Sequence, residues 1–163
     1  MTDFDGLLRL LAERNVEFIL VGGVAATAHG SARYTADLDV VYRRTPENIS
    51  RLVNALASVT PYLRGAPRGL PFRWDAETIA HGLNFTLVTS LGDIDVLGEI
   101  VGGGTYEELK AHCMKIAAWG VECLCLSLDM LIYVKRAAGR PKDFEAIAEL
   151  EALREEHGRE KGA

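Results

Sequence analysis

Two pairs of aspartates separated by one residue stand inside apolar segments of this sequence, and this arrangement favours metal chemistry. Asp37 and Asp39 stand in ADLDVVY, and Asp93 and Asp95 stand in GDIDVLG. Because side chains alternate along a strand, Asp37 and Asp39 would point to one face, about 7 Å apart. If the two strands are neighbours, Asp37, Asp39 and Asp95 converge on one edge of the sheet. Three such carboxylates would suit Mg²⁺, which prefers oxygen ligands.

Carboxylates on an apolar strand are costly unless a cation or solvent compensates them. Two Mg²⁺ ions about 3.5–4 Å apart, with Mn²⁺ able to substitute, would hold the attacking and leaving oxygens of an in-line displacement. The alternative is that Asp93 and Asp95 lie on an exposed strand face and that Asp37 caps a turn.

A glycine turn precedes the first aspartate pair. Gly22 and Gly23 separate an apolar strand (18–21) from a short helix of small residues (24–29). A glycine turn at the start of a helix presents backbone N–H groups to phosphate. Arg33 lies between this turn and the aspartates, where it would contact phosphate or form a surface salt bridge. These features together predict a site for a metal and a phosphate.

Other candidate motifs lack the residues that their chemistry needs. The glycines at 102–104 are not followed by the GK[ST] of a phosphate-binding loop. The four histidines show no shared spacing for zinc. The three cysteines are odd in number and form no CxxC pair, which is typical of reduced, buried thiols.

The bulk composition is that of an ordinary globular protein. The 163 residues predict a single domain covering 1–163, with a frayed tail at 157–163. The net charge of −5 argues against a protein that coats nucleic acid without specificity. No apolar run reaches the roughly 18–20 residues of a membrane span, and the N-terminus is acidic rather than a signal peptide. We therefore expect a cytoplasmic protein with no membrane partner.

Hydrophobic periodicity and capping residues predict alternating helices and strands. The first helix would be capped by Thr2 and end near residue 15, and Thr45 would cap a helix that begins with Pro46. Strands are expected at 36–42, 83–89 and 92–98. A helix at 105–112 would be followed by a hairpin of 114–118 and 121–126, by a helix from Ser127 to Lys135, and by a closing helix from 142 to about 156.

Residues 60–80 contain three prolines and two glycines and read as a long irregular loop. Its arginines, Arg64, Arg68 and Arg73, would face a polyanion or lie solvated at the surface. The whole pattern predicts an α/β (α+β) protein with a small twisted mixed sheet, flanked by helices mostly on one face.

The order of the motifs resembles the nucleotidyltransferase superfamily with a DNA polymerase β-like core. The resemblance rests on Gly22-Gly23, the Asp-x-Asp of RYTADLD, and the later Asp95. The closing segment KRAAGRPKDFEAI is similar to the C-terminal signature of the AbiEii-type bacterial branch. The resemblance as a whole covers roughly residues 16–150. Many members carry Gly-Ser where this chain has Gly22-Gly23, so backbone N–H groups would have to replace the serine hydroxyl.

This resemblance implies a nucleotidyltransferase that moves a nucleoside monophosphate from an NTP to an acceptor hydroxyl and releases pyrophosphate. Asp37, Asp39 and Asp95 would bind the metals, and Asp95 would also accept the proton of the attacking hydroxyl. The implied nucleotide-binding residues are Gly22, Gly23, Arg33, Thr35, Lys135, Lys142 and Asp143. The acceptor would be RNA, a protein or a small molecule, and a cognate antitoxin or toxin would be a further partner in a toxin–antitoxin or related defence system.

Two other functional classes stay open at this point. The chain would be a catalytically inactive nucleotide-binding regulatory module if it binds nucleotide without turnover. It would be a structural or interaction protein if its acidic strands merely face solvent. The basic residues of the closing segment, including Lys135, Arg140 and Lys142, could equally be helix-end charges favoured by the helix dipole.

Overall fold

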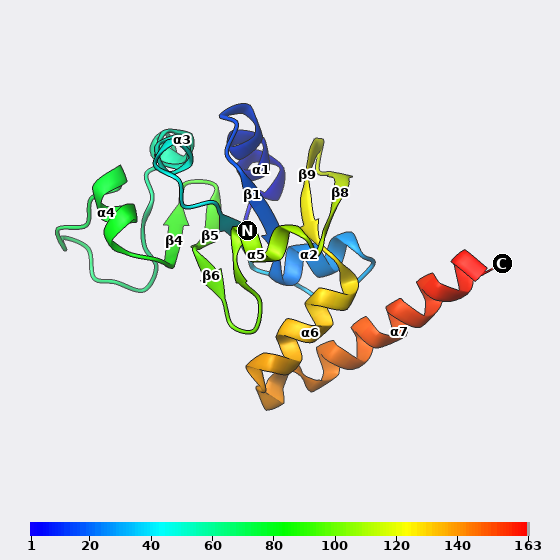
Figure 1. Ribbon diagram of the computed structural model, residues 1–163. Coiled ribbons are helices and arrows are strands. Elements are labelled where there is room, and N and C mark those ends of the chain that lie inside the picture. The colour runs from blue at the N-terminus through cyan, green and yellow to red at the C-terminus, as the bar shows by residue number, and fades with distance from the viewer. Residues whose placement is uncertain (163) are drawn as a thin grey trace.

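The computed structural model describes residues 1–162 (Figure 1). One seven-stranded mixed sheet has the order β3-β4-β5-β2-β1-β9-β8, and a separate two-stranded sheet pairs β6 with β7. The strands are β1 (Phe18–Val21), β2 (Asp37–Tyr42), β3 (Tyr62–Leu63), β4 (Phe85–Thr89), β5 (Gly92–Leu97), β6 (Glu99–Ile100), β7 (Gly104–Thr105), β8 (Cys113–Ala118) and β9 (Val121–Leu126). The helices are α1 (Phe4–Glu13), α2 (Gly22–Ala28), α3 (Pro46–Ala57), α4 (Ala76–His81), α5 (Tyr106–Lys110), α6 (Leu128–Ala138) and α7 (Phe144–Gly162), with a 3₁₀ turn, η1 (Pro141–Asp143), between the last two.

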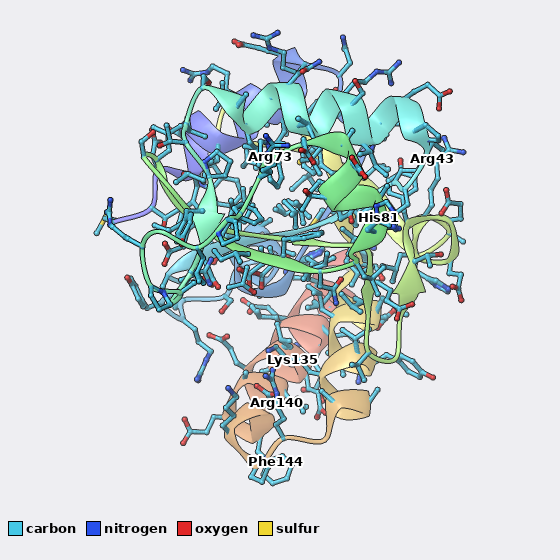
Figure 2. All side chains as sticks on the ribbon, turned by 90° about the vertical axis from the view of Figure 1, so that its left-hand side faces the viewer. Arg43, Arg73, His81, Lys135, Arg140 and Phe144 are labelled. Carbon is cyan, nitrogen blue, oxygen red and sulfur yellow. The ribbon has the colours of Figure 1, made fainter. Side chains whose placement is uncertain are left out.

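The expected mixed sheet flanked by helices is confirmed, but the helices do not gather on one face. All four residues of β1 are buried, so both faces of the sheet are covered at its centre. Figure 2 shows α3 on one side of the sheet, and the pair formed by α6 and α7 on the other. The far end of α7 extends away from the body of the molecule (Figure 1).

Local signals placed the starts of three helices correctly. The Thr45 side chain accepts from the Asn48 N–H at the start of α3. Thr105 and Glu108 form the expected capping box of α5, and Ser127 caps α6. The αL conformation that glycine tolerates ends α6 at Gly139, where φ is 64°.

Several predicted boundaries differ from the structure: α6 runs to Ala138 rather than Lys135, α5 ends at Lys110 rather than 112, and three further differences concern α1, α2 and α7. Asp3, and not Thr2, caps α1, because the Thr2 hydroxyl instead donates to the Ala36 carbonyl, 2.5 Å away. Helix α2 begins at Gly22, so the two glycines form its first turn rather than a separate turn before it. Helix α7 continues past residue 156 to Gly162, so residues 157–162 are helical and not the frayed tail that the sequence predicts. The last residue of that tail, Ala163, lies outside the described residues.

The segment 60–80 is more ordered than we expected. It contains β3, which pairs antiparallel with β4, and α4. The Trp74 indole N–H donates to the Val53 carbonyl of α3 at 3.0 Å, and the Tyr62 and Phe72 rings pack edge to face. The Trp74 contact joins the segment to α3, and the Tyr62–Phe72 contact holds two parts of the segment together.

A buried amide joins the strands that carry the site to α3. Asn48 has no solvent exposure and makes three hydrogen bonds to backbone groups, two at Glu17 and one at Arg43. Glu17 precedes β1 and Arg43 follows β2, so this side chain fixes the two strands where they leave the core. Among residues 1–162, no helix combines the length and apolar character needed to cross a membrane.

Candidate active site

The aspartates that the sequence singled out meet on two neighbouring strands. Strands β2 and β5 run parallel, and their register pairs Asp37 with Asp93 and Asp39 with Asp95. One carboxylate oxygen from each of Asp37, Asp39 and Asp95 lies within 4.8 Å of the other two. The prediction that the strands of Asp39 and Asp95 are neighbours is therefore confirmed. We call Asp37, Asp39 and Asp95 the aspartate triad.

The environment of the triad disfavours three negative charges. Burial, followed by the charges of Asp37 and Asp95, raises the pKa of Asp39 from 3.8 to about 8. Burial and then the charge of Asp95 also raise the pKa of Asp37. The positive charge of Arg64 lowers the pKa of both groups but does not cancel these effects. The triad is therefore a site that a further cation would stabilise.

The residues present fit a divalent cation. The Oδ1 atom of Asp39 is buried and has no hydrogen-bond partner among the residues that the structure describes, and an unpaired buried carboxylate oxygen is costly. Mg²⁺ at about 2.1 Å from each oxygen would place ligand atoms at most about 4.2 Å apart. Small side-chain rotations would bring the triad oxygens within that limit.

Glycine at position 22 allows the triad to pack against α2. Gly22 has φ +67°, and a Cβ atom there would lie 2.2 Å from Asp39 Oδ2. A side chain at this position would therefore displace the Asp39 carboxylate. The strand pairing of Val21 with Asp39 brings the two together.

Gly23 also lies close to another side chain, that of Thr35. A Cβ atom there would lie 2.6 Å from Thr35 Oγ1. The Thr35 hydroxyl donates to the Asp37 carbonyl at 3.2 Å, which fixes it beside the triad strand. The Thr35 hydroxyl thus lies in the space that a serine side chain at position 23 would occupy.

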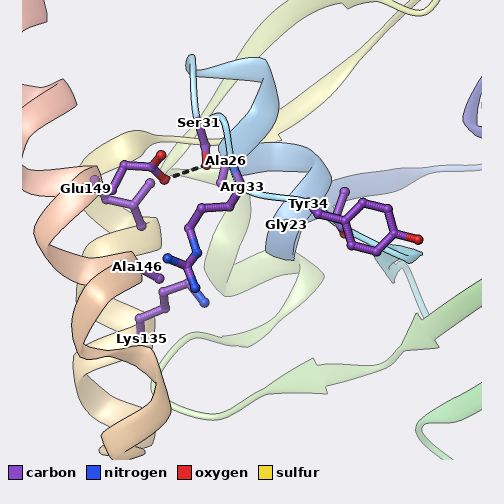
Figure 3. A pocket seen from close by; sticks show the side chains of 10 residues that line it. Gly23, Ala26, Ser31, Arg33, Tyr34, Lys135, Ala146 and Glu149 are labelled. Carbon is purple, nitrogen blue, oxygen red and sulfur yellow. Dashed lines mark hydrogen bonds between the residues drawn. The ribbon is translucent and has the colours of Figure 1, made fainter.

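A cavity of about 130 Å³ opens beside α2, and it gathers four of the predicted nucleotide-binding residues: Gly23, Arg33, Thr35 and Lys135. Figure 3 shows the Arg33 and Lys135 side chains approaching each other across this cavity, whereas the Tyr34 ring points away. Ser31 donates to Glu149 of α7 at 2.5 Å and closes one wall. We call this space the basic cavity.

A second cavity of about 380 Å³ borders Gly22 and the Asp39 member of the triad. Gly22, Asp39, Lys135 and Arg140 contribute to its wall, and the rest of its lining is apolar: Val21, Leu97, Ile100, Val101, Leu131, Val134 and Ala138. Lys135 borders both cavities. We call this space the apolar cavity.

The basic residues of the closing segment separate into two environments. Asp143 is buried, and its carboxylate lies 3.7 Å from Lys135 Nζ and 2.7 Å from Arg140 Nε. Burial alone would raise the pKa of Asp143, but the Arg140 hydrogen bond and the nearby positive charges hold it below its usual value. Lys142 is exposed on η1, and Figure 2 shows Lys135 and Arg140 on the side of the sheet that α6 and α7 cover.

Sequence reasoning missed the part that Arg64 plays in this site. Its guanidinium lies 2.8 Å from Asp95 Oδ1 and 3.5 Å from oxygens of Asp37 and Asp93. The sequence predicts that the arginines of residues 60–80 face a polyanion or solvent. No sequence signal indicated this contact, because it depends on the pairing of the two-residue strand β3 with β4. Arg33 pairs with Glu145 at 3.8 Å, as the salt-bridge alternative predicted, and also lines the basic cavity.

Comparison with solved structures identifies the fold. The chain is similar to LnuA, a lincosamide antibiotic adenylyltransferase with lincomycin bound, at a TM-score of 0.61 and 13% identity, over 93% of this chain and 98% of that one. It is also similar to ANT(2″)-Ia in complex with adenylyl-2″-tobramycin, at a TM-score of 0.57 and 17% identity, over 97% and 95% of the two chains. The chain has a nucleotidyltransferase fold.

A third structure agrees with this assignment. The similarity to a putative nucleotidyltransferase from Thermotoga maritima has a TM-score of 0.51 and 14% identity, over 94% of this chain and 91% of that one. No protein-family model matches the sequence, and no curated protein matches it. At these identities the similarity shows the fold alone, so the chemistry has to be argued from the site.

Proposed function

We propose that this protein is a Mg²⁺-dependent nucleotidyltransferase that moves a nucleoside monophosphate from an NTP to the hydroxyl of a small-molecule acceptor. The observation that carries the proposal is the aspartate triad on β2 and β5, with Asp39 Oδ1 buried and unpaired, within a nucleotidyltransferase fold. A structural role for these carboxylates would not explain why the fold keeps them together at such an electrostatic cost.

The proposed roles follow the geometry. Asp37, Asp39 and Asp95 would hold one or two divalent ions, which neutralise phosphate charge and orient the reacting groups. The donor triphosphate would lie along Gly22 and Gly23 between the two cavities.

Four basic or polar side chains are proposed to act on the donor. Arg33 and Lys135 would contact phosphate oxygens from the basic cavity, and Thr35 would do so by turning its hydroxyl proton from the Asp37 carbonyl to a phosphate oxygen. Lys142 would act only by its charge, since it is exposed on η1. Asp143 would orient Lys135 through the contact that already joins them.

The reaction would proceed as an in-line displacement at the α-phosphorus. The oxygen of the acceptor hydroxyl forms a bond to that phosphorus, the bond to the bridging oxygen of the β-phosphate breaks, and pyrophosphate leaves with its electron pair. Asp95 would take the proton of the attacking hydroxyl. Positioning and charge neutralisation would supply most of the rate enhancement.

A small-molecule acceptor is favoured over RNA or protein. Two of the similar structures hold an antibiotic or an adenylylated antibiotic, lincomycin in one and adenylyl-2″-tobramycin in the other. A partner in a toxin–antitoxin system and membership of the AbiEii-type branch rest on the sequence resemblance only.

The test is release of pyrophosphate and transfer of label from each α-labelled NTP, with Mg²⁺ and a cell extract fractionated into small molecules, RNA and protein. We expect label in the small-molecule fraction. Asp37→Asn and Asp95→Asn should each reduce turnover at least about 100-fold, whereas the exposed Asp5→Asn should not. Undiminished turnover in both triad variants would refute the assignment, and nucleotide binding without pyrophosphate release would favour the inactive regulatory module.

A further inference from the structure

The Arg64 side chain fills the space between the carboxylates of β2 and β5. Its Nη2 atom lies 2.8 Å from Asp95 Oδ1 and donates to the Leu87 carbonyl of β4 at 2.8 Å. Its Nη1 atom lies 3.5 Å from Asp37 Oδ2, and its Nε atom lies 3.5 Å from Asp93 Oδ2. One guanidinium therefore serves three carboxylates, two of which belong to the aspartate triad.

This pairing is incomplete. The Arg64 Nε atom is buried and has no hydrogen-bond partner among the described residues, since its 3.5 Å approach to Asp93 lacks suitable hydrogen-bond geometry. Asp39, the most perturbed member of the triad, receives no hydrogen bond from Arg64 at its buried Oδ1. A guanidinium usually binds carboxylates through two parallel hydrogen bonds. Arg64 thus compensates the negative charge without satisfying the site.

Arg64 is also placed so that its side chain can leave without a change in the backbone. Its N–H donates to the Thr86 carbonyl at 2.9 Å, which anchors the residue at the end of β3. The side chain keeps 27% of its surface exposed to solvent. Rotation about its side-chain bonds would move the guanidinium from the triad toward solvent.

We propose that Arg64 is an internal counter-ion of the aspartate triad, and that a divalent cation must displace its guanidinium in order to bind. Both Arg64 and the ion would draw on the carboxylates of Asp95 and Asp37, and two positive charges at one site repel each other. Arg64 therefore sets the affinity of the site for the ion and stabilises the metal-free protein. This inference rests on the proposed function, because it takes the triad as the metal site.

The direct test is the affinity for Mn²⁺ alone, measured by calorimetry on the full chain without nucleotide. Arg64→Gln removes the charge but keeps a polar side chain, and it should bind Mn²⁺ about tenfold more tightly than the wild type, or about 1.4 kcal/mol. Arg68→Gln is the matched control, because Arg68 is exposed in the same segment and forms no ion pair within residues 1–162. It should bind Mn²⁺ as the wild type does.

Thermal unfolding supplies a second readout. In EDTA, Arg64→Gln should unfold at a lower temperature than the wild type, because the carboxylates lose their counter-ion. Saturating Mn²⁺ should raise its unfolding temperature by more than it raises that of the wild type. Arg64→Ala, measured in the same way, guards against an effect specific to glutamine.

Asp95→Asn separates the two possible failures. If the wild type and both Arg64 variants bind Mn²⁺ with equal affinity and Asp95→Asn abolishes binding, the metal site stands and the role of Arg64 is wrong. If Arg64→Gln and Arg64→Ala unfold cooperatively but bind Mn²⁺ more weakly than the wild type, Arg64 aids the ion instead of competing with it, which also overturns the inference. If no form binds Mn²⁺, both the inference and the proposed metal site fail.

Discussion

Replacing Asp39 with asparagine should stabilise the metal-free protein at neutral pH, although it removes a proposed metal ligand. Burial and the charges of Asp37 and Asp95 raise the pKa of Asp39 from 3.8 to about 8 in the folded protein. Between these two values the folded protein holds a proton on Asp39 that the unfolded chain releases. The stability that this group contributes is therefore complete below about pH 4 and is lost as the pH rises through about 8.

The size of the effect follows from the slope of this linkage, about 1.4 kcal/mol per pH unit. From about pH 5 to about pH 7, one fully perturbed carboxyl would reduce the free energy of unfolding by about 3 kcal/mol. Asp37 titrates in the same direction and shares part of the effect, since its pKa is also raised. We therefore expect the wild type to lose about 1–2 kcal/mol more than Asp39→Asn over this interval.

Urea unfolding in EDTA at a series of pH values measures this difference. The Asp39→Asn curve should be flatter than that of the wild type, and the two should diverge as the pH rises. Asp5→Asn, an exposed change in the first turn of α1, should track the wild type. A difference between wild type and Asp39→Asn that stays constant from about pH 5 to pH 7 would refute the electrostatic reasoning.

Two further predictions concern the packing that supports the site, and urea unfolding measures both. Gly23→Ser should destabilise the protein by about 1–3 kcal/mol because its Cβ would lie 2.6 Å from Thr35 Oγ1. Adding Thr35→Gly to this variant should recover part of the lost stability. The control Gly158→Ser, at a position where the space is open, should change the stability little. Asn48→Ala should cost about 2–4 kcal/mol because it leaves three buried backbone hydrogen bonds unmade, whereas the exposed Asn54→Ala should stay within about 0.5 kcal/mol. A Gly23→Ser protein as stable as the wild type, or equal losses at Asn48 and Asn54, would contradict these assignments.

The features that could be predicted from the sequence are those that depend on near neighbours. Strand alternation placed Asp37 and Asp39 on one face, and capping residues located the starts of α3, α5 and α6. The convergence of Asp95 on Asp39 required one further assumption, that β2 and β5 pair, and the register confirms it. The sequence suggested this pairing because both strands carry an aspartate pair in an apolar setting.

The features that could not be predicted are contacts between residues that lie far apart in the chain. The Arg64 contact spans 31 residues to Asp95 and depends on β3, which is too short to show any alternation. The cap of α1 was misplaced for a similar reason: the Thr2 hydroxyl is taken by Ala36, 34 residues away, and also accepts from the Asp93 N–H. In both cases a side chain that reads as local or solvated in sequence instead contacts the strands of the triad.

Position 23 shows how such a contact changes the interpretation of a sequence difference. By sequence alone, Gly23 lacks the serine hydroxyl that many nucleotidyltransferases carry, which suggests a weakened phosphate contact. In the structure, Thr35 Oγ1 occupies the space that a side chain at position 23 would need. A serine at 23 would therefore force Thr35 to move from its observed position, and glycine at 23 allows Thr35 to lie at the start of α2. The basic cavity keeps a hydroxyl beside Gly23, supplied from the loop that precedes β2.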